Sequence, residues 1–293
     1  MSVQKRVAAI HDISCFGRCS LTVALPIISA VGIETSVVPT AVLSTHTGGF
    51  SGFTYRDLTD DILPIADHWQ SLNLAFDALY TGFLGSFKQI DIIEELFGRF
   101  KTKDNVILVD PVMADNGKLY AIFPDDFPKG MRKLCAKADI IVPNLTEASL
   151  LLGQPYREGP YEDEYIENIL VSLSELGPKQ VVLTGVFFDD DRLGAAAYDR
   201  RTDEITYALA DKIPGYYHGT GDVFASVLLA ALLKGNSLAH AAQIAVDFTV
   251  GSIKRTQQAK TDVRYGVNFE QGLLKLAGQL NQQTGDIDEQ RNY

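Results

Sequence analysis

The chain has few cysteines and no long apolar run. Its three cysteines, Cys15, Cys19 and Cys135, are an odd number and lack the paired spacing of a zinc site. No stretch approaches the roughly 20 apolar residues that a membrane helix needs. The apolar run at residues 7–10 is also too short for a signal peptide. We therefore expect reduced thiols and an unprocessed, soluble, cytoplasmic protein.

Positive charge is scarce as well. Lys and Arg number 26 against 37 Asp and Glu, which gives a net charge of -11. A surface of this sign argues against nucleic acid or an anionic membrane as the main partner, although ATP can still be bound through backbone N–H groups and a metal. The length of 293 residues and a hydrophobic content of 46% allow a large core. We predict one domain over residues 1–280 and a polar, frayed tail over residues 281–293.

Two common nucleotide-binding signatures are also missing. There is no Gly-x-x-x-x-Gly-Lys-Ser/Thr string, and Phe224 stands where a dinucleotide-binding fingerprint needs glycine. A P-loop site and a Rossmann site are therefore both excluded, so any phosphate site must be built differently.

What the chain does have is an alternation of short apolar runs with amphipathic ones. The runs predict buried strands at residues 7–10, 36–38, 78–81, 106–109, 140–142 and 181–183, and helices at 21–31, 90–100, 131–138, 165–176, 223–233 and 238–253. Residues 193–198 and 204–209 flank a polar turn and predict a late antiparallel pair. This order predicts an α/β fold of three layers, a mostly parallel central sheet with helices on both faces.

The most informative segment is a glycine turn followed by an acid at the start of a predicted helix, His218-Gly219-Thr220-Gly221-Asp222. Glycines free backbone N–H groups to face a phosphate, and the helix that follows adds its positive end. Asp222 could accept a proton. The alternative is a tight turn before a core helix, with Asp222 as a first-turn acid only.

Polar residues also follow several predicted strands. They are His11 and Asp12, Asp110 and Asp115, Asn144 and Glu147, and Thr184 and Gly185. Ligands of such sheets gather at the carboxyl ends of the strands, and carboxylates there can hold Mg²⁺. Each pair has a structural alternative, because Asp is common in turns and Asn144 with Glu147 is typical of a capping box. Their convergence on one edge favours a phosphoryl transfer site.

Three motifs in this order resemble the ribokinase-like superfamily: Asp110-Pro111-Val112, Asn144-x-x-Glu147 and Gly219-Thr220-Gly221-Asp222. The first two predicted strands lie too close in sequence for the lid of the sugar kinases, so the resemblance implies the vitamin kinase branch without a separate lid domain. Asp110-Pro111-Val112-Met113-x-Asp115, with Ser44-Thr45-His46-Thr47-Gly48 upstream, is most similar to pyridoxal kinases.

The resemblance implies a role for each matching residue in an ATP- and Mg²⁺-dependent kinase of vitamin B6. Asp222 matches the base that takes the proton of the substrate's 5′-hydroxyl, and Gly219, Thr220 and Gly221 match an anion hole. Asn144 and Glu147 match the motif that orders Mg²⁺, with Asp110 and Asp115 at the phosphates. Thr184 and Gly185 match nucleotide contacts, while Asp12 and Thr47 match positions at the pyridine ring. The family also suggests a homodimer, and a monovalent cation remains open.

One departure concerns Asp12, because many pyridoxal kinases have serine there. A carboxylate could pair with a protonated ring nitrogen or with the aminomethyl group of pyridoxamine, which favours pyridoxamine over pyridoxal, or it could only cap a turn. Two other functions stay open. One is a hydroxymethylpyrimidine kinase of thiamine synthesis, and the other is a non-catalytic vitamin or nucleotide binding protein.

Overall fold

The computed structural model describes residues 4–290, with side chains through Gln282. Its strands are β1 (Arg6–Phe16), β2 (Glu34–Thr45), β3 (Tyr55–Asp57), β4 (Ala78–Thr81), β5 (Val106–Val109), β6 (Ala114–Asp115), β7 (Lys118–Leu119), β8 (Ile140–Ile141), β9 (Gln180–Val186), β10 (Arg192–Asp199) and β11 (Glu204–Asp211). Its helices are α1 (Leu21–Ala30), α2 (Thr59–Ser71), α3 (Phe87–Phe100), α4 (Phe127–Cys135), α5 (Leu145–Leu152), α6 (Asp163–Glu175), α7 (Thr220–Leu233), α8 (Leu238–Ala259) and α9 (Leu273–Gln290), with short 3-10 turns η1 (Val263–Tyr265) and η2 (Glu270–Gly272). None of these helices is both long and apolar enough to cross a membrane.

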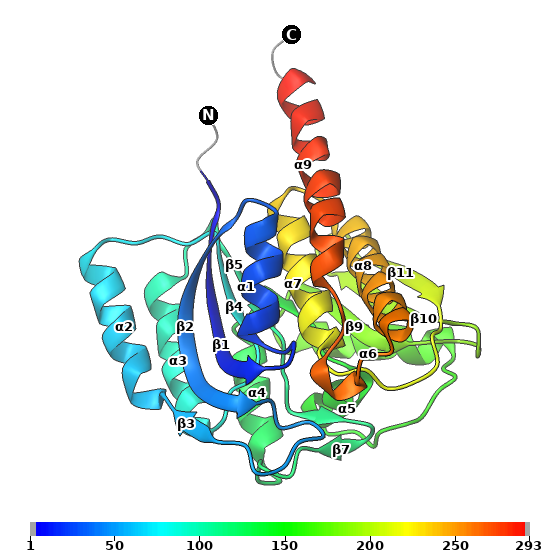
Figure 1. Ribbon diagram of the computed structural model, residues 1–293, viewed down its shortest axis with the longest axis horizontal. Coiled ribbons are helices and arrows are strands. Elements are labelled where there is room, and N and C mark those ends of the chain that lie inside the picture. Colours follow the sequence, from blue (N-terminus) through cyan, green and yellow to red (C-terminus); the bar gives the residue numbers. More distant parts are fainter. Residues whose placement is uncertain (1–3, 291–293) are drawn as a thin grey trace.

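Nine strands form one mixed sheet in the order β11-β10-β9-β8-β5-β4-β1-β2-β3. The six strands from β9 to β2 run parallel, and the added strands at both edges are antiparallel (Figure 1). The predicted antiparallel pair is confirmed as β10 and β11. Because the six central strands share one direction, their carboxyl ends meet at one edge of the sheet.

Two hydrophobic cores lie on opposite faces of this sheet. One joins α2, α3, α4, α5 and α6 to residues such as Ile10, Leu79 and Ile107. The other joins α1, α7, α8 and α9 to Val7, Tyr80 and Leu108. Alternate residues of the buried strands therefore face alternate cores, as the period of a strand requires. This arrangement confirms the predicted three-layer fold.

The structure extends the predicted elements in ways that matter for the site. Strand β1 continues to Phe16, so His11 and Asp12 lie within the strand and not at its end. Its register against β2 shifts between His11 and Ile13. Helices α2 and α9 were not predicted from the sequence, and the backbone stays helical through Gln290 where a frayed tail was expected. Residues 291–293 of that tail lie outside the described residues.

Candidate active site

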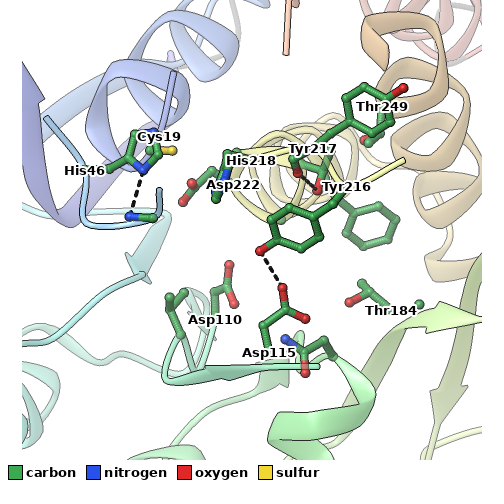
Figure 2. Close-up of a pocket in the computed structure, with 18 of the residues that line it drawn as sticks. Cys19, His46, Asp110, Asp115, Thr184, Tyr216, Tyr217, His218, Asp222 and Thr249 are labelled. Atoms are coloured by element: carbon green, nitrogen blue, oxygen red, sulfur yellow. Dashed lines mark hydrogen bonds between the residues drawn. The ribbon is translucent and has the colours of Figure 1, made fainter. Parts of the chain in front are cut away.

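A cavity of about 720 Å³ opens at the carboxyl-terminal edge of the sheet, between the ends of the parallel strands and the start of α7 (Figure 2). The residues predicted for the site all line it: Asp12, Thr47, Asp110, Asp115, Asn144, Glu147, Thr184, Gly185, Gly219, Thr220, Gly221 and Asp222. They come from segments as far apart in sequence as β1 and α7. The predicted convergence is therefore present, while the role of each residue remains a prediction.

The glycine turn places the N-terminus of α7 at the cavity. Gly219 caps the helix in the left-handed conformation with φ 76°, and a Cβ there would lie 2.0 Å from the carbonyl oxygen of Arg18. Only glycine meets both requirements without strain. Gly221 lies in the first turn, and a Cβ there would have no atom within 4 Å. The N–H groups of this first turn have no partners within the helix and can face an anion.

Asp222 follows in the same turn, is half-buried and lines the cavity. Burial, opposed by a hydrogen bond from the Ser20 backbone and assisted by the negative charge of Asp12, raises the pKa of its carboxyl to about 7. A carboxylate with such a pKa is a better proton acceptor near neutral pH than an exposed one, because a base works best when its pKa lies near the operating pH.

Two buried carboxylates, Asp110 and Glu147, face the same cavity, and they are 6% and 3% exposed. Glu147 accepts hydrogen bonds from the backbone N–H groups of Asn144 and Met113. The side chain of Asn144 in turn accepts the N–H of Glu147, so the structural alternative of a capping box is confirmed. Burial raises the pKa of both carboxyls, and the charge of Glu147 raises that of Asp110 further.

Asp110 and Glu147 are suited to hold a magnesium ion whose remaining ligands come from water and from the phosphates of the substrate. Among the described residues no cluster of three or more His, Cys, Asp or Glu side chains is placed to hold a metal. Mg²⁺ is usually bound by one or two carboxylates together with waters and phosphate oxygens, so such a cluster is not needed. Two buried acids raise each other's pKa when both are ionised. A divalent cation bound by them would oppose this effect and stabilise both as carboxylates.

Sequence reasoning missed Tyr216, which lies across the middle of the cavity in Figure 2. Its hydroxyl donates to Oδ2 of Asp115 at 2.6 Å, and its ring packs edge-on against His218, with centroids 4.9 Å apart. His218 approaches His46 in turn, at 5.1 Å between ring centroids. Tyr216 and Asp115 are 101 positions apart in the sequence, so no local sequence pattern predicts their contact. In Figure 2, Tyr216 lies between His46 on one side of the cavity and Thr184 on the other, and the charge of His46 acts on Asp12. We call these two sides the Asp12 end and the Thr184 end.

The Thr184 end is bordered by β9, β10 and α8. The hydroxyl of Thr184 donates to the carbonyl of Pro143 at 3.4 Å, and Gly185 has φ 79°. Thr249 of α8 and Tyr217 lie on the opposite wall. Apolar side chains of α8, including Val246 and Ile253, also line this end. A polar rim over an apolar wall suits a flat heteroaromatic ring bearing phosphates.

The lining residues at the Asp12 end include Asp12, His46 and Thr47. Asp12 is 4% exposed and accepts a hydrogen bond from the Ser14 hydroxyl at 3.2 Å. Thr47 is exposed at the mouth, and Phe53 and Phe83 contribute aromatic surface. This end therefore offers aromatic faces and the buried carboxylate of Asp12, with Asp222 nearby, to a second ligand.

Comparisons with known proteins identify a family for this chain. The profile of the family described as phosphomethylpyrimidine kinase matches residues 25–267. The chain is similar to a pyridoxal kinase of Ovis aries, with 31% identity over 69% of each chain. A solved putative phosphomethylpyrimidine kinase from Bacteroides thetaiotaomicron is 40% identical over 94% of each chain with a TM-score of 0.90, and another crystal form of it contains pyridoxal. Pyridoxal kinase from Lactobacillus plantarum is 33% identical over 94% of this chain and 98% of that one, with a TM-score of 0.85.

Proposed function

This chain belongs to the phosphomethylpyrimidine kinase family, within the ribokinase-like superfamily, and we propose that it transfers the γ-phosphate of ATP to the 5′-hydroxyl of a B6 vitamer. Its class is that of a phosphotransferase with an alcohol group as acceptor. Pyridoxamine, pyridoxal and pyridoxine are the candidate acceptors. The observation that carries the proposal is one cavity in which a helix start, an acid with a raised pKa and two buried carboxylates meet.

Asp222 is the proposed base. Its carboxylate accepts the proton of the 5′-hydroxyl as that oxygen attacks the γ-phosphorus, and the bond to the bridging oxygen of ADP breaks. The position favours this role because Asp222 directly follows the glycine turn, so proton acceptor and anion hole lie within one helical turn. The N–H groups of Gly219, Thr220 and Gly221 are proposed to stabilise the charge that gathers on the transferred group. The Thr220 hydroxyl donates to the carbonyl of Tyr217 at 3.1 Å, which holds the turn in place.

Asp110 and Glu147 are proposed to hold Mg²⁺ with the phosphates of ATP. When bound, the ion neutralises charge on the phosphate oxygens. Asn144 positions Glu147 through the capping box, and it donates from its side chain to the carbonyl of Ala114 at 2.9 Å. Asp115 lies beside this group at β6, and its contact with Tyr216 keeps its carboxylate at the phosphate end of the cavity.

The pH dependence of the reaction should report Asp222. A base must be unprotonated, so kcat/KM is expected to fall about tenfold per unit as the pH drops below about 7, and to level off above it. Groups that face Asp222 from other elements are Asp12, Cys19, Tyr80 and Asp110, none of them cationic. Steady-state rates with pyridoxine and with pyridoxamine should share this acid limb, because it belongs to the enzyme. A profile that is flat from about pH 5 to pH 8 would contradict Asp222 as the base.

The second candidate is a hydroxymethylpyrimidine kinase, which the description of the matching family favours. Its acceptor is also a small heteroaromatic alcohol, so the same base and anion hole would serve it. A competition assay separates the two: the purified enzyme, ATP and Mg²⁺ are incubated with equal concentrations of pyridoxamine, pyridoxine and hydroxymethylpyrimidine. We expect the vitamers to be phosphorylated first. Preferential phosphorylation of the pyrimidine would replace the proposed function by the second one.

A further inference from the structure

The cavity is strongly unbalanced in charge. Six acids line it, namely Asp12, Asp110, Asp115, Glu147, Asp211 and Asp222, and among the described lining residues Lys212 is the one lysine or arginine. Carboxylates that are removed from water need a partner cation or hydrogen bonds, because an isolated buried charge is costly. The positive charge that offsets these carboxylates must therefore come from the ligands of the site.

Lys212 does not supply that balance. Its ammonium lies 4.3 Å from the centroid of the Phe187 ring and 3.7 Å from a carboxylate oxygen of Asp190, and neither of these residues lines the cavity. The Lys212 head group is thus directed toward the outer ends of β9 and β10 and away from Asp12.

Both histidines of the cavity favour the neutral state. The backbone N–H of Gly48 donates to Nδ1 of His46 at 3.2 Å, so the ring proton is on Nε2, which donates to the carbonyl of Arg264 at 2.6 Å. Both nitrogens are then satisfied in the neutral ring. Burial lowers the pKa of His46 and of His218, which opposes a charge on either one.

Asp12 is therefore left without a cation. Its carboxylate accepts from Ser14, and Ser20 adds a second hydroxyl, while no ion pair reaches it in the part of the chain that the structure describes. Burial raises its pKa, and Asp222 adds a second negative group on the same side of the cavity. The shift of register in β1 next to Asp12 marks a local irregularity of the strand where it borders the cavity.

We infer that Asp12 selects a substrate that brings its own ammonium group, so that pyridoxamine is preferred over pyridoxine and pyridoxal. This inference rests on the proposed function, because it assigns a preference among its acceptors. Pyridoxamine carries an ammonium at the aminomethyl substituent, where pyridoxine has a hydroxyl and pyridoxal an aldehyde. The other cation that could pair with Asp12 is a protonated ring nitrogen, which all three vitamers share, so pairing with it would leave their ratio unchanged when Asp12 is replaced. Mg²⁺ at Asp110 and Glu147 is a separate matter, because neither of these carboxylates is among the groups whose charge shifts the pKa of Asp12.

The test compares kcat/KM for pyridoxamine and pyridoxine in the wild type, Asp12→Asn and Asp12→Ser. A charge-assisted hydrogen bond contributes enough that the Asn variant should lose about 10- to 100-fold on pyridoxamine. Pyridoxine should change less than about threefold, so the ratio of the two constants falls. Asp211→Asn is the matched control, since it also neutralises a cavity acid but lies at the end of β11, and its ratio should stay that of the wild type.

The outcomes separate the inference from the function on which it rests. If the wild type phosphorylates the vitamers and Asp12→Asn keeps the wild-type ratio, the selection by Asp12 is wrong and the function stands. If the wild type phosphorylates none of the vitamers, the proposed function is wrong and the inference fails with it. Melting curves show whether the variants fold. The wild type alone also tests the inference, because a higher kcat/KM for pyridoxine than for pyridoxamine would overturn it.

Discussion

Asp222→Asn is expected to lower kcat for vitamer phosphorylation by about 10²- to 10⁴-fold. The amide has the shape of the carboxylate but cannot accept the proton of the attacking hydroxyl. The loss should fall on kcat more than on KM, because the proton moves only in the transition state. Steady-state kinetics with ATP, Mg²⁺ and pyridoxamine measure both constants.

The control for this variant is Asp247→Asn. Asp247 is an exposed acid of α8 that accepts from Gln243 and does not line the cavity. It should keep the kcat of the wild type. Since burial already disfavours the charge of Asp222, its neutral variant should melt no lower than the wild type. Turnover near the wild-type rate in a folded Asp222→Asn protein would remove Asp222 as the base.

The second large effect is a loss of stability that we expect when Gly219 is replaced. Gly219→Ala places a Cβ 2.0 Å from the backbone oxygen of Arg18 and forces a left-handed conformation on a residue that disfavours it. We expect a loss of about 3 kcal/mol or more in the free energy of unfolding, because the clash is with backbone and cannot be relieved by a side-chain rotation. Chemical denaturation with a single probe of α7 packing, such as near-UV circular dichroism, measures it.

Gly221→Ala is the companion variant that separates an effect on stability from an effect on catalysis. A Cβ there meets no atom within 4 Å, and alanine favours the first turn of a helix, so stability should be unchanged or slightly raised. The methyl group points into space where the phosphate is proposed to bind, and kcat is expected to fall about tenfold or more. Wild-type stability in Gly219→Ala would contradict the steric account, and wild-type kcat in Gly221→Ala would contradict the anion hole.

Much of this site could be predicted because its parts are local in sequence. The glycine turn, the capping box and the acids after buried strands each show in a few adjacent residues, and the shared direction of the strands brings them together. Strands β4 and β5 have the predicted limits, since short apolar runs bounded by polar residues define them.

The rest depends on contacts that no short pattern encodes. The extension of β1 to Phe16 follows from its pairing with β2 along residues that are not uniformly apolar, such as Ser14. Helix α2 has only three buried residues, one of them the polar Thr59, so its apolar period is weak. The contacts of Tyr216 with Asp115 and of His46 with Arg264 are set by segments that approach from distant parts of the chain.

Phosphoryl transfer from ATP to pyridoxamine, measured side by side for the wild type and Asp222→Asn with mass-spectrometric detection of the product, tests the central claim most directly. The account predicts pyridoxamine 5′-phosphate with the wild type, in step with ADP release, and almost none with a variant that melts normally. Absence of a phosphorylated vitamer with the wild type, or equal product from both proteins, would contradict it.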